Sequence, residues 1–488
     1  MMKNLTKLSL LAVLLFVIGC YSDDELSYSP FYDMSTDMTG VTGDNYNQII
    51  ENPFINVTDE PTSTFSIDAD GAAYANVRRF LQQDNQLPPA AAVRTEELIN
   101  YFDYNYAFNA SQHPIDLNGE VSQCPWNTNN KLIRIGIKGE PMTQRPPSNF
   151  VFLVDVSGSM NSSDKLGLLQ QGFSMLVDEL GANDRVAIVT YSGDVDVALA
   201  STTCDNKSKI KRAINKLDAD GSTAGGKAIE MAYDIAEQYF IQGGNNRIIV
   251  GTDGDFNVGI TSQDDLVELI EEKRDLGVFL TILGVGRGNY NEGTLEQMAN
   301  HGNGTFEYLD KIDQLTKVFI HDYGKFYTVA KDVKVQVQFD STNVEAYRLI
   351  GYENRVLDNA DFTNDSIDAG EIGAGQNITA LYEIIPKQSI TETTPIFSID
   401  FRYKAPDATV SIPLNLPIYN SNNTFTQASE AMIFAGSVTA FGMLLIDSQY
   451  KQQLTYDDIL QWMNGNIIYD PHGYKTEFWD LVNTAKNL

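Results

Sequence analysis

The stretch that decides the fold is Val151-Phe-Leu-Val-Asp155-Val-Ser157-Gly-Ser159-Met160. Its first four residues are apolar and two of them are β-branched, which is typical of a buried strand. The strand ends at Asp155, and Ser157 and Ser159 follow at alternate positions. In open α/β sheets, ligands bind beyond the carboxyl ends of the strands. The stretch therefore predicts a buried strand that carries one carboxylate and two hydroxyls to a binding edge.

These three oxygen groups suit a hard divalent cation. A tight turn can direct all three to one point, and Mg²⁺ prefers an octahedron of about six oxygen ligands. Two later segments can supply more oxygens: the polar loop 218–223 ends at Thr223, and the apolar strand 247–252 runs into Asp253. We predict that these segments meet at one edge of a sheet. Mg²⁺ is the expected ion, and Mn²⁺ and Ca²⁺ are the alternatives.

The order and spacing of Asp155-x-Ser157-x-Ser159, Thr223 and Asp253 resemble the metal-ion-dependent adhesion site of a von Willebrand factor type A (VWA) domain. A short Asp/Ser pattern alone is common in loops, whereas five matching positions at the ends of suitable elements are specific. The alternative is that these residues only cap helices and turns and bind no ion. The resemblance implies that the five residues are the metal ligands.

The alternation of strands and helices over residues 148–328 predicts an α/β domain with a doubly wound, mostly parallel sheet. Residues 329–425 instead alternate apolar and polar side chains, notably over 333–339, which predicts an antiparallel β-sandwich. Strand-like runs within 115–138 lie outside the helical pattern. We expect them to join the second sheet, which would make the VWA domain an insertion within one β domain.

The remaining parts of the chain are shorter. Residues 21–60 are polar without a period and predict a flexible tether. Residues 61–147 predict an N-terminal region of helices followed by strands, and residues 426–488 predict a C-terminal helical region. Both flanking regions resemble those of bacterial VWA lipoproteins, on the segments 74–80, 96–102, 347–355 and 434–450.

Residues 1–20 predict an export signal that ends in a lipid anchor. Lys3 and Lys7 precede an apolar run over 8–18, which is about half the length that a membrane span requires. The ending Val17-Ile-Gly-Cys20 resembles a bacterial lipobox, which implies cleavage before Cys20 and lipidation of its thiol. The acidic run after Cys20 resembles a surface-export tag, with a plain solvated tether as the alternative. We expect a lipid-anchored protein of the cell envelope, at the outer membrane, with exposure on the cell surface left open.

Charge and cysteine content limit the partners. The chain has 488 residues and a formal net charge of −31, so its surface repels phosphate backbones and we expect no nucleic acid partner. The loop 221–227 nearly matches a phosphate loop, but Ala228 stands where a hydroxyl is required, and we expect no nucleotide. Cys124 and Cys204 can form a disulfide in an exported protein or remain free.

These observations predict a binding protein rather than an enzyme. Asp155 and Asp253 are the only acids expected at the ion, so a divalent ion stays poorly neutralised and favours an Asp or Glu carboxylate from a protein partner. The first alternative is a metal-dependent hydrolase, which needs a general base such as Asp194 or Asp255 beside the ion. The second is a structural or assembly factor of the envelope, in which the metal only stabilises loops.

Overall fold

The computed structural model describes residues 38–39, 44–67, 70–109, 112–220, 227–254, 263–287, 292–367, 369–387 and 395–488. Residues 37–488 form one unit. Its framework consists of one six-stranded sheet in the α/β domain and two further sheets of six and five strands. A short pair of strands, β1 (Met38–Thr39) and β2 (Asn45–Tyr46), lies outside these sheets.

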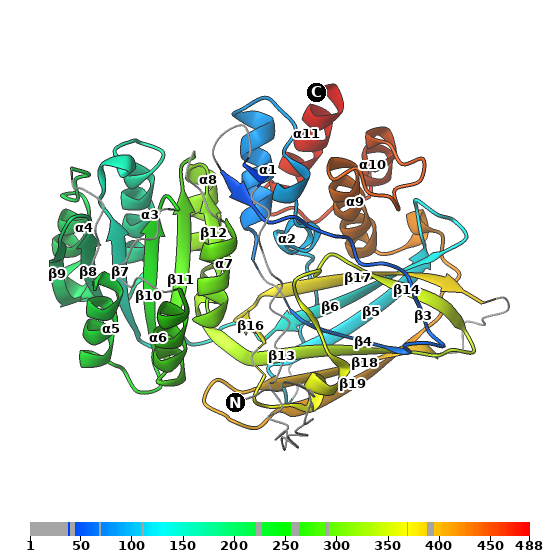
Figure 1. The fold of residues 1–488 in the computed structure, drawn as a ribbon, viewed down its shortest axis with the longest axis horizontal. Helices are drawn as coiled ribbons and strands as arrows, with labels where there is room; N and C mark the ends of the chain where they lie inside the picture. Colours follow the sequence, from blue (N-terminus) through cyan, green and yellow to red (C-terminus); the bar gives the residue numbers. More distant parts are fainter. Residues whose placement is uncertain are drawn as a thin grey trace, which may run out of the picture. The chain divides into compact units, whose positions relative to one another are not determined.

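The α/β domain is doubly wound, as predicted. Its sheet has the order β12-β11-β10-β7-β8-β9, and every neighbouring pair is parallel except β8 and β9. Side chains of the central strand alternate between two cores, Val151 and Leu153 in one and Phe150 and Phe152 in the other, so helices cover both faces (Figure 1). The strands are β7 (Ser148–Asp155), β8 (Arg185–Tyr191), β9 (Val195–Thr203), β10 (Asn245–Thr252), β11 (Val278–Val285) and β12 (Phe306–Leu309). The helices are α3 (Leu166–Glu179), α4 (Lys207–Ile214), α5 (Ala228–Gln238), α6 (Gln263–Asp275), α7 (Glu292–His301) and α8 (Ile312–Thr316).

The other two sheets enclose a separate apolar core and form a β-sandwich. One has the order β15-β4-β13-β18-β19 with β16 paired to β13, and the other has the order β3-β14-β17-β6-β5. Phe65 and Val337 of the first sheet pack in the same core as Ile135 and Tyr382 of the second. The strands are β3 (Ile55–Asn56), β4 (Thr62–Ser66), β5 (Ile115–Gln123), β6 (Lys131–Gly139), β13 (Thr328–Phe339), β14 (Val344–Ile350), β15 (Val356–Leu357), β16 (Gly370–Gly373), β17 (Asn377–Pro386), β18 (Pro395–Lys404) and β19 (Ile412–Tyr419).

The strands before the α/β domain belong to this sandwich. β6 lies antiparallel to β17, with Ile133 opposite Tyr382, and β5 pairs with β6. The prediction that segment 115–138 joins the later β domain is therefore confirmed, and the α/β domain is inserted between β6 and β13. The sandwich is not made from residues 329–425 alone, because β3, β4, β5 and β6 complete its sheets.

Residues 44–60 differ from the expected tether. β3 pairs with β14, and Asp44 and Tyr46 are buried beside the helix α1 (Ala72–Gln82). Arg79 donates to Asp44 at 2.9 Å, and Asn76 donates to the Tyr46 hydroxyl at 2.8 Å. Composition predicts a tether because the segment is polar, but buried polar groups are stable once each has a partner. Those partners lie too far along the chain for composition to identify them.

Helices from both ends of the chain share one further core. α1 and α2 (Thr95–Asn100) pack with α9 (Glu430–Leu445), α10 (Tyr456–Met463) and α11 (Tyr474–Asn487). The Phe434 ring lies 4.8 Å from that of Phe102 and 5.6 Å from that of Phe478. The predicted N-terminal and C-terminal helical regions are thus one layer. None of the described helices combines the length and the apolar content that crossing a bilayer requires.

The two described cysteines remain free thiols. Cys124 is buried in the core shared by the terminal helices, and Cys204 is buried in the α/β domain. Of the two alternatives that the sequence leaves open, the structure therefore has the reduced form.

Candidate functional site

Two buried carboxylates end adjacent strands of the α/β sheet. Asp155 is the last residue of β7, and Asp253 follows β10 directly. Val154 lies opposite Gly251 in the parallel ladder, so both acids reach the same edge. Their residues are 1% and 0% exposed. We call the edge formed by Asp155, Ser157, Ser159 and Asp253 the metal edge.

The loop after β7 folds back on its own carboxylate. The Ser157 backbone N–H donates to Asp155 Oδ1 at 2.8 Å, and the hydroxyl oxygens of Ser157 and Ser159 lie 3.0 Å apart. A short 3₁₀ turn, Gly158–Met160, follows, and the Met160 side chain is buried. Asp, Ser and Gly favour such a turn because their short side chains bond nearby backbone groups. The turn brings Asp155, Ser157 and Ser159 together, as the spacing predicts.

The other predicted positions have different outcomes. Asp253 joins the metal edge, whereas Thr223 lies outside the described residues. Of the two acids considered as general bases, Asp194 is exposed, and Asp255 also lies outside the described residues. Cys20 and the signal segment 1–20 lie outside them as well.

A lysine that the sequence analysis missed occupies the metal edge. Lys165 Nζ lies 2.8 Å from Asp253 Oδ2, and the Lys165 side chain is 13% exposed. The aliphatic part of Lys165 packs over Gly286, where an added Cβ would come within 2.3 Å of Lys165 Cε. No spacing rule points to this lysine, because it comes from a loop and its partner follows a different strand.

The donor set of the metal edge fits a hard divalent cation. Two carboxylates and two hydroxyls give only oxygen ligands, which Mg²⁺, Mn²⁺ and Ca²⁺ prefer. Over the part of the chain that the structure describes, no three His, Cys, Asp or Glu side chains are grouped to hold a metal ion. An ion at the metal edge would therefore depend on the neutral hydroxyls beside Asp155 and Asp253.

A second charged region lies between the α/β domain and the helical layer. Arg78 of α1 bonds both oxygens of Asp310, at 2.5 and 2.9 Å, and Glu477 of α11 at 2.9 Å. Arg94 contacts Glu97 at 3.4 Å, Glu292 at 3.5 Å and Glu296 at 3.1 Å. We call this region the ionic junction, and its members are Arg78, Arg94, Glu97, Glu292, Glu296, Asp310 and Glu477.

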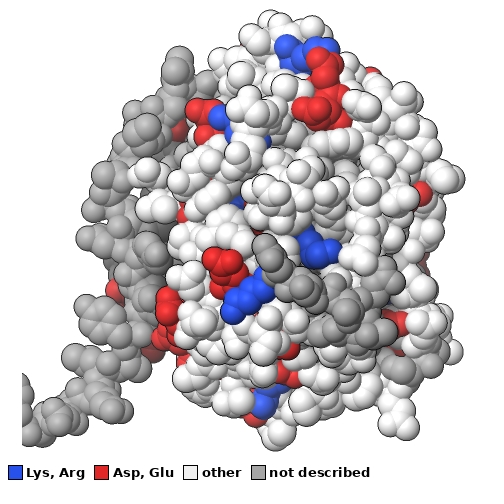
Figure 2. Space-filling model, turned by 90° about the vertical axis from the view of Figure 1, so that its right-hand side faces the viewer, with Lys and Arg blue, Asp and Glu red and all other residues white. Residues whose placement is uncertain are grey.

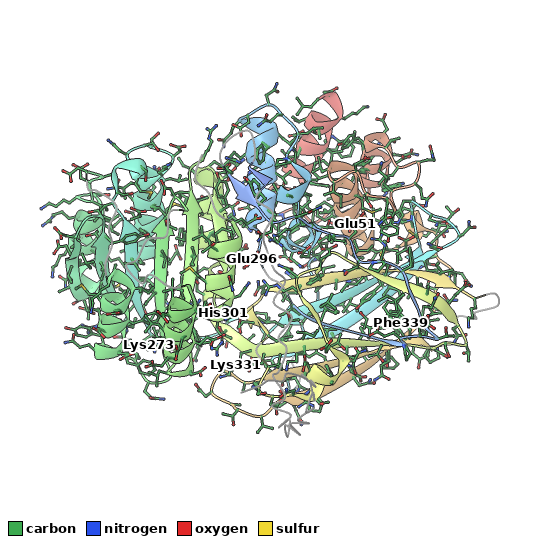
Figure 3. The ribbon with its side chains drawn as sticks, viewed as in Figure 1. Glu51, Lys273, Glu296, His301, Lys331 and Phe339 are labelled. Carbon is green, nitrogen blue, oxygen red and sulfur yellow. The ribbon has the colours of Figure 1, made fainter. Side chains whose placement is uncertain are left out.

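The ionic junction holds more carboxylates around Arg94 than one guanidinium can neutralise. Glu296, labelled in Figure 3, lies on α7 and also accepts from Asn354 at 2.9 Å. Burial raises the pKa of the neighbouring Glu292 to about 7, and the charge of Glu296 adds to this effect while Arg94 opposes it. Sequence reasoning missed the junction because Arg78 and Glu477 are 399 positions apart.

Charged side chains of the described residues are dispersed over the face that Figure 2 shows. On the face in Figure 2, Asp and Glu side chains of the described residues lie in small groups beside Lys and Arg. Two histidines do meet in space: the rings of His321 and His472 stack with centroids 3.6 Å apart, and His321 Nδ1 lies 2.8 Å from the Tyr474 hydroxyl. This pair connects the α/β domain to the turn before α11.

Three family models match successive parts of the chain. The model described as "von Willebrand factor" matches residues 41–134. The model described as "von Willebrand factor type A domain" matches residues 149–320. The model described as "Uncharacterized protein YfbK, C-terminal" matches residues 324–488. The middle match includes all five predicted ligands.

Curated relatives and solved structures include similar proteins. "Uncharacterized protein YfbK" of Escherichia coli K12 is 39% identical over 470 residues, which cover 91% of this chain and 81% of that protein. "Uncharacterized protein sll0103" of Synechocystis is 25% identical over 197 residues, which cover 39% of this chain and 45% of that one. The solved structure "von Willebrand factor type A from Catenulispora acidiphila" is 15% identical, covers 77% of this chain and 91% of its own, and has a TM-score of 0.44. On the identity and coverage shared with YfbK, the chain belongs to the YfbK family of VWA-domain proteins.

Proposed function

We propose that this protein is a lipid-anchored protein of the cell envelope that binds a protein partner through a divalent ion at the metal edge. One observation carries the proposal. Ser157 contacts both Asp155 and Ser159 at the carboxyl end of β7, and Asp253 directly follows the neighbouring strand β10. A turn that served only as a cap would not need a second buried acid at the same edge.

The proposed ligands are Asp155, Ser157, Ser159, Thr223 and Asp253, with Mg²⁺ as the expected ion. Bound there, the ion would supply a positive centre for an anionic oxygen ligand. Two carboxylates match the formal charge of a divalent ion, which corrects the expectation of a poorly neutralised ion, but they fill only part of its shell of about six oxygen ligands. An Asp or Glu carboxylate of the partner is therefore the favoured additional ligand, because an amide or hydroxyl brings no charge.

The proposed lipid anchor needs an attachment point on the chain, and we propose the Cys20 thiol. Each buried methylene of an acyl chain contributes about 0.8 kcal/mol, so two or more chains anchor stably. Cys20→Ala should move the protein from the membrane fraction to the soluble fraction. Retention of this variant in membranes after a salt wash would show that the anchor is elsewhere.

Among the described residues, nothing favours the hydrolase alternative. A metal-activated water needs a general base within hydrogen-bond reach. Asp194 is exposed, and Asp255 lies outside the described residues. We propose a binding role, in adhesion or in assembly of the envelope, on the oxygen ligands of the metal edge and the match to the von Willebrand factor type A model.

The binding role can be tested by cross-linked capture from intact cells. Wild-type protein, Asp155→Ala and the control Asp178→Ala are compared with Mg²⁺, with excess chelator, and after Mg²⁺ is restored. Asp178 is an exposed acid on α3, and its carboxylate forms a surface ion pair with Lys211. Wild type and Asp178→Ala should capture one partner, and only when Mg²⁺ is present. Asp155→Ala should not capture it under any of these conditions. Equal capture in excess chelator would overturn the proposal.

A further inference from the structure

The Lys165 side chain lies in a mostly buried position at the metal edge, between Asp253 and Gly286. Its ammonium lies 2.8 Å from Asp253 Oδ2, and Asp253 is fully buried. Its aliphatic stem packs on Gly286, which follows β11, the strand beside β10 in the sheet. An ordinary surface lysine is solvated and mobile, whereas this one is enclosed along its length.

Gly286 leaves the space that the Lys165 side chain occupies. Its φ of +77° lies in the left-handed region that favours glycine, and an added Cβ would lie 2.3, 2.7 and 2.9 Å from Lys165 Cε, Cγ and Cδ. The Gly286 carbonyl accepts from the buried Tyr308 hydroxyl at 2.6 Å, which fixes the backbone at that point. Tyr308, Gly286, Lys165 and Asp253 thus form a continuous chain of contacts that places the ammonium on the carboxylate.

A divalent ion at the metal edge and the Lys165 ammonium would both bind the Asp253 carboxylate. Two cations at one carboxylate repel each other, and the repulsion is stronger in a partly buried site than in water because the effective dielectric is lower. Lys165 cannot diffuse away, since it is covalently part of the loop before α3. It therefore acts at an effective concentration that is set by the tether and does not change when the protein is diluted.

We propose that Lys165 is a tethered competitor of the divalent ion for Asp253, and that ion binding releases its ammonium toward solvent. This inference rests on the metal site of the proposed function. It makes ion binding weaker and more readily reversed than the two carboxylates alone would allow. It also converts occupancy of the site into a movement of Lys165 next to the surface that a partner would contact.

The first test compares ion affinity by titration calorimetry of the full chain in detergent, with Mg²⁺ and then Mn²⁺. Lys165→Met keeps a stem of similar length and removes the charge. Lys273→Met is the matched control, because the Lys273 side chain is 14% exposed and pairs with Glu237 at 2.6 Å. Lys273 lies near the end of α6 (Figure 3), at the opposite edge of the sheet from the metal edge. Lys165→Met should bind Mg²⁺ at least tenfold more tightly than wild type, and Lys273→Met should bind it as wild type does.

The second test needs no variant and therefore holds even if Lys165→Met folds poorly. Wild-type protein is treated with an amine-acylating reagent with and without saturating Mg²⁺, and the modification of each lysine is followed by mass spectrometry. Acylation of Lys165 should become several times faster with Mg²⁺, while the rate at Lys273 should not change. Equal rates at Lys165 in both conditions would overturn the release step.

The outcomes separate this inference from the function on which it rests. If wild type binds Mg²⁺ and Lys165→Met binds it equally or more weakly, the competition is refuted while the metal site stands. If Lys165→Met binds Mg²⁺ more tightly but partner capture is the same with and without chelator, the competition stands and the metal-dependent binding role is refuted. If no variant binds a divalent ion, both are refuted.

Discussion

The metal edge and the ionic junction both bury charge, yet they do so in different ways. In the junction, Arg78 is bonded to Asp310 and Glu477, and its charge is met by side chains from two other elements. At the metal edge, two carboxylates lie beside two hydroxyls, and Lys165 pairs with one of the carboxylates, that of Asp253. The first arrangement supplies both signs from within the protein, and the second supplies mostly oxygen ligands.

This difference separates a structural cluster from a binding site. Burying a charge is costly unless it is paired and hydrogen-bonded, so a stable junction brings its own counter-ions. An edge rich in neutral hydroxyls gains little stability from them and instead matches the ligand preference of a hard cation. Buried charge alone therefore does not identify function, whereas the kind of partner around it does.

The largest effect is expected at the junction. Arg78→Met leaves Asp310, which is fully buried, without its bidentate partner, and loss of one member of a buried pair costs about 3–5 kcal/mol. Urea unfolding should show a corresponding loss of free energy of unfolding. The control is Arg287→Met, since Arg287 is 45% exposed and its pair with Asp84 is worth less than about 1 kcal/mol. Equal effects of the two substitutions would show that the junction is not the stronger element.

The junction should also make stability depend on pH. Because the pKa of Glu292 is about 7 in the folded protein and 4.5 ordinarily, the folded state binds more protons between these values. The free energy of unfolding should therefore fall as pH rises from about 5 to 8, by up to about 3 kcal/mol from this group. Glu292→Gln should flatten the decline, and Glu230→Gln should not, because the Glu230 side chain on α5 is 44% exposed. A wild-type-like slope in Glu292→Gln would contradict the assignment.

At the metal edge, loss of a hydroxyl should matter less than loss of a carboxylate. Ser157→Ala removes one neutral ligand, which water can replace, so Mg²⁺ affinity should fall only about tenfold, at the lower end of the range for groups that support a metal site. Calorimetry measures the change, and circular dichroism checks that the fold is retained. A loss as complete as that of Asp155→Ala would mean that Ser157 has a structural role as well.

The smallest effect is expected from reducing agent. Cys124 and Cys204 are free and lie in different cores, so dithiothreitol should leave the melting temperature unchanged. Burial raises the pKa of the Cys204 thiol to about 12 and that of Cys124 well above its ordinary value, so both should react slowly with a thiol reagent until the protein unfolds. A fall in melting temperature on reduction would indicate a disulfide.

Local pattern was sufficient for the α/β domain and for most of the metal edge. The apolar run before Asp155 and the alternation of strands and helices depend on neighbours in sequence, and both appear as predicted. The membership of β5 and β6 in the sandwich also followed, because their spacing did not fit the helical pattern. Each of these features depends on residues that lie close together in the sequence, so a local pattern can predict it.

Long-range partners could not be predicted in this way. Asp44 is one of several polar residues in a segment whose composition predicts a tether, whereas in the fold it is buried and paired with Arg79 of α1. Lys165 has the same character, since its importance comes from Asp253 and Gly286 on other strands. A charged side chain shows its role only when the fold brings its partner to it.

The central claim is that the metal edge holds a divalent ion, and the most direct measurement is Mg²⁺ and Mn²⁺ titration calorimetry of the full chain beside Asp155→Ala. Wild type should show a single site, and Asp155→Ala should reduce its affinity by more than the roughly 10–100-fold typical of groups that support a metal site. Far-ultraviolet circular dichroism should be the same for both proteins. Absence of binding heat in wild type for both ions, or equal affinity in Asp155→Ala, would contradict the account.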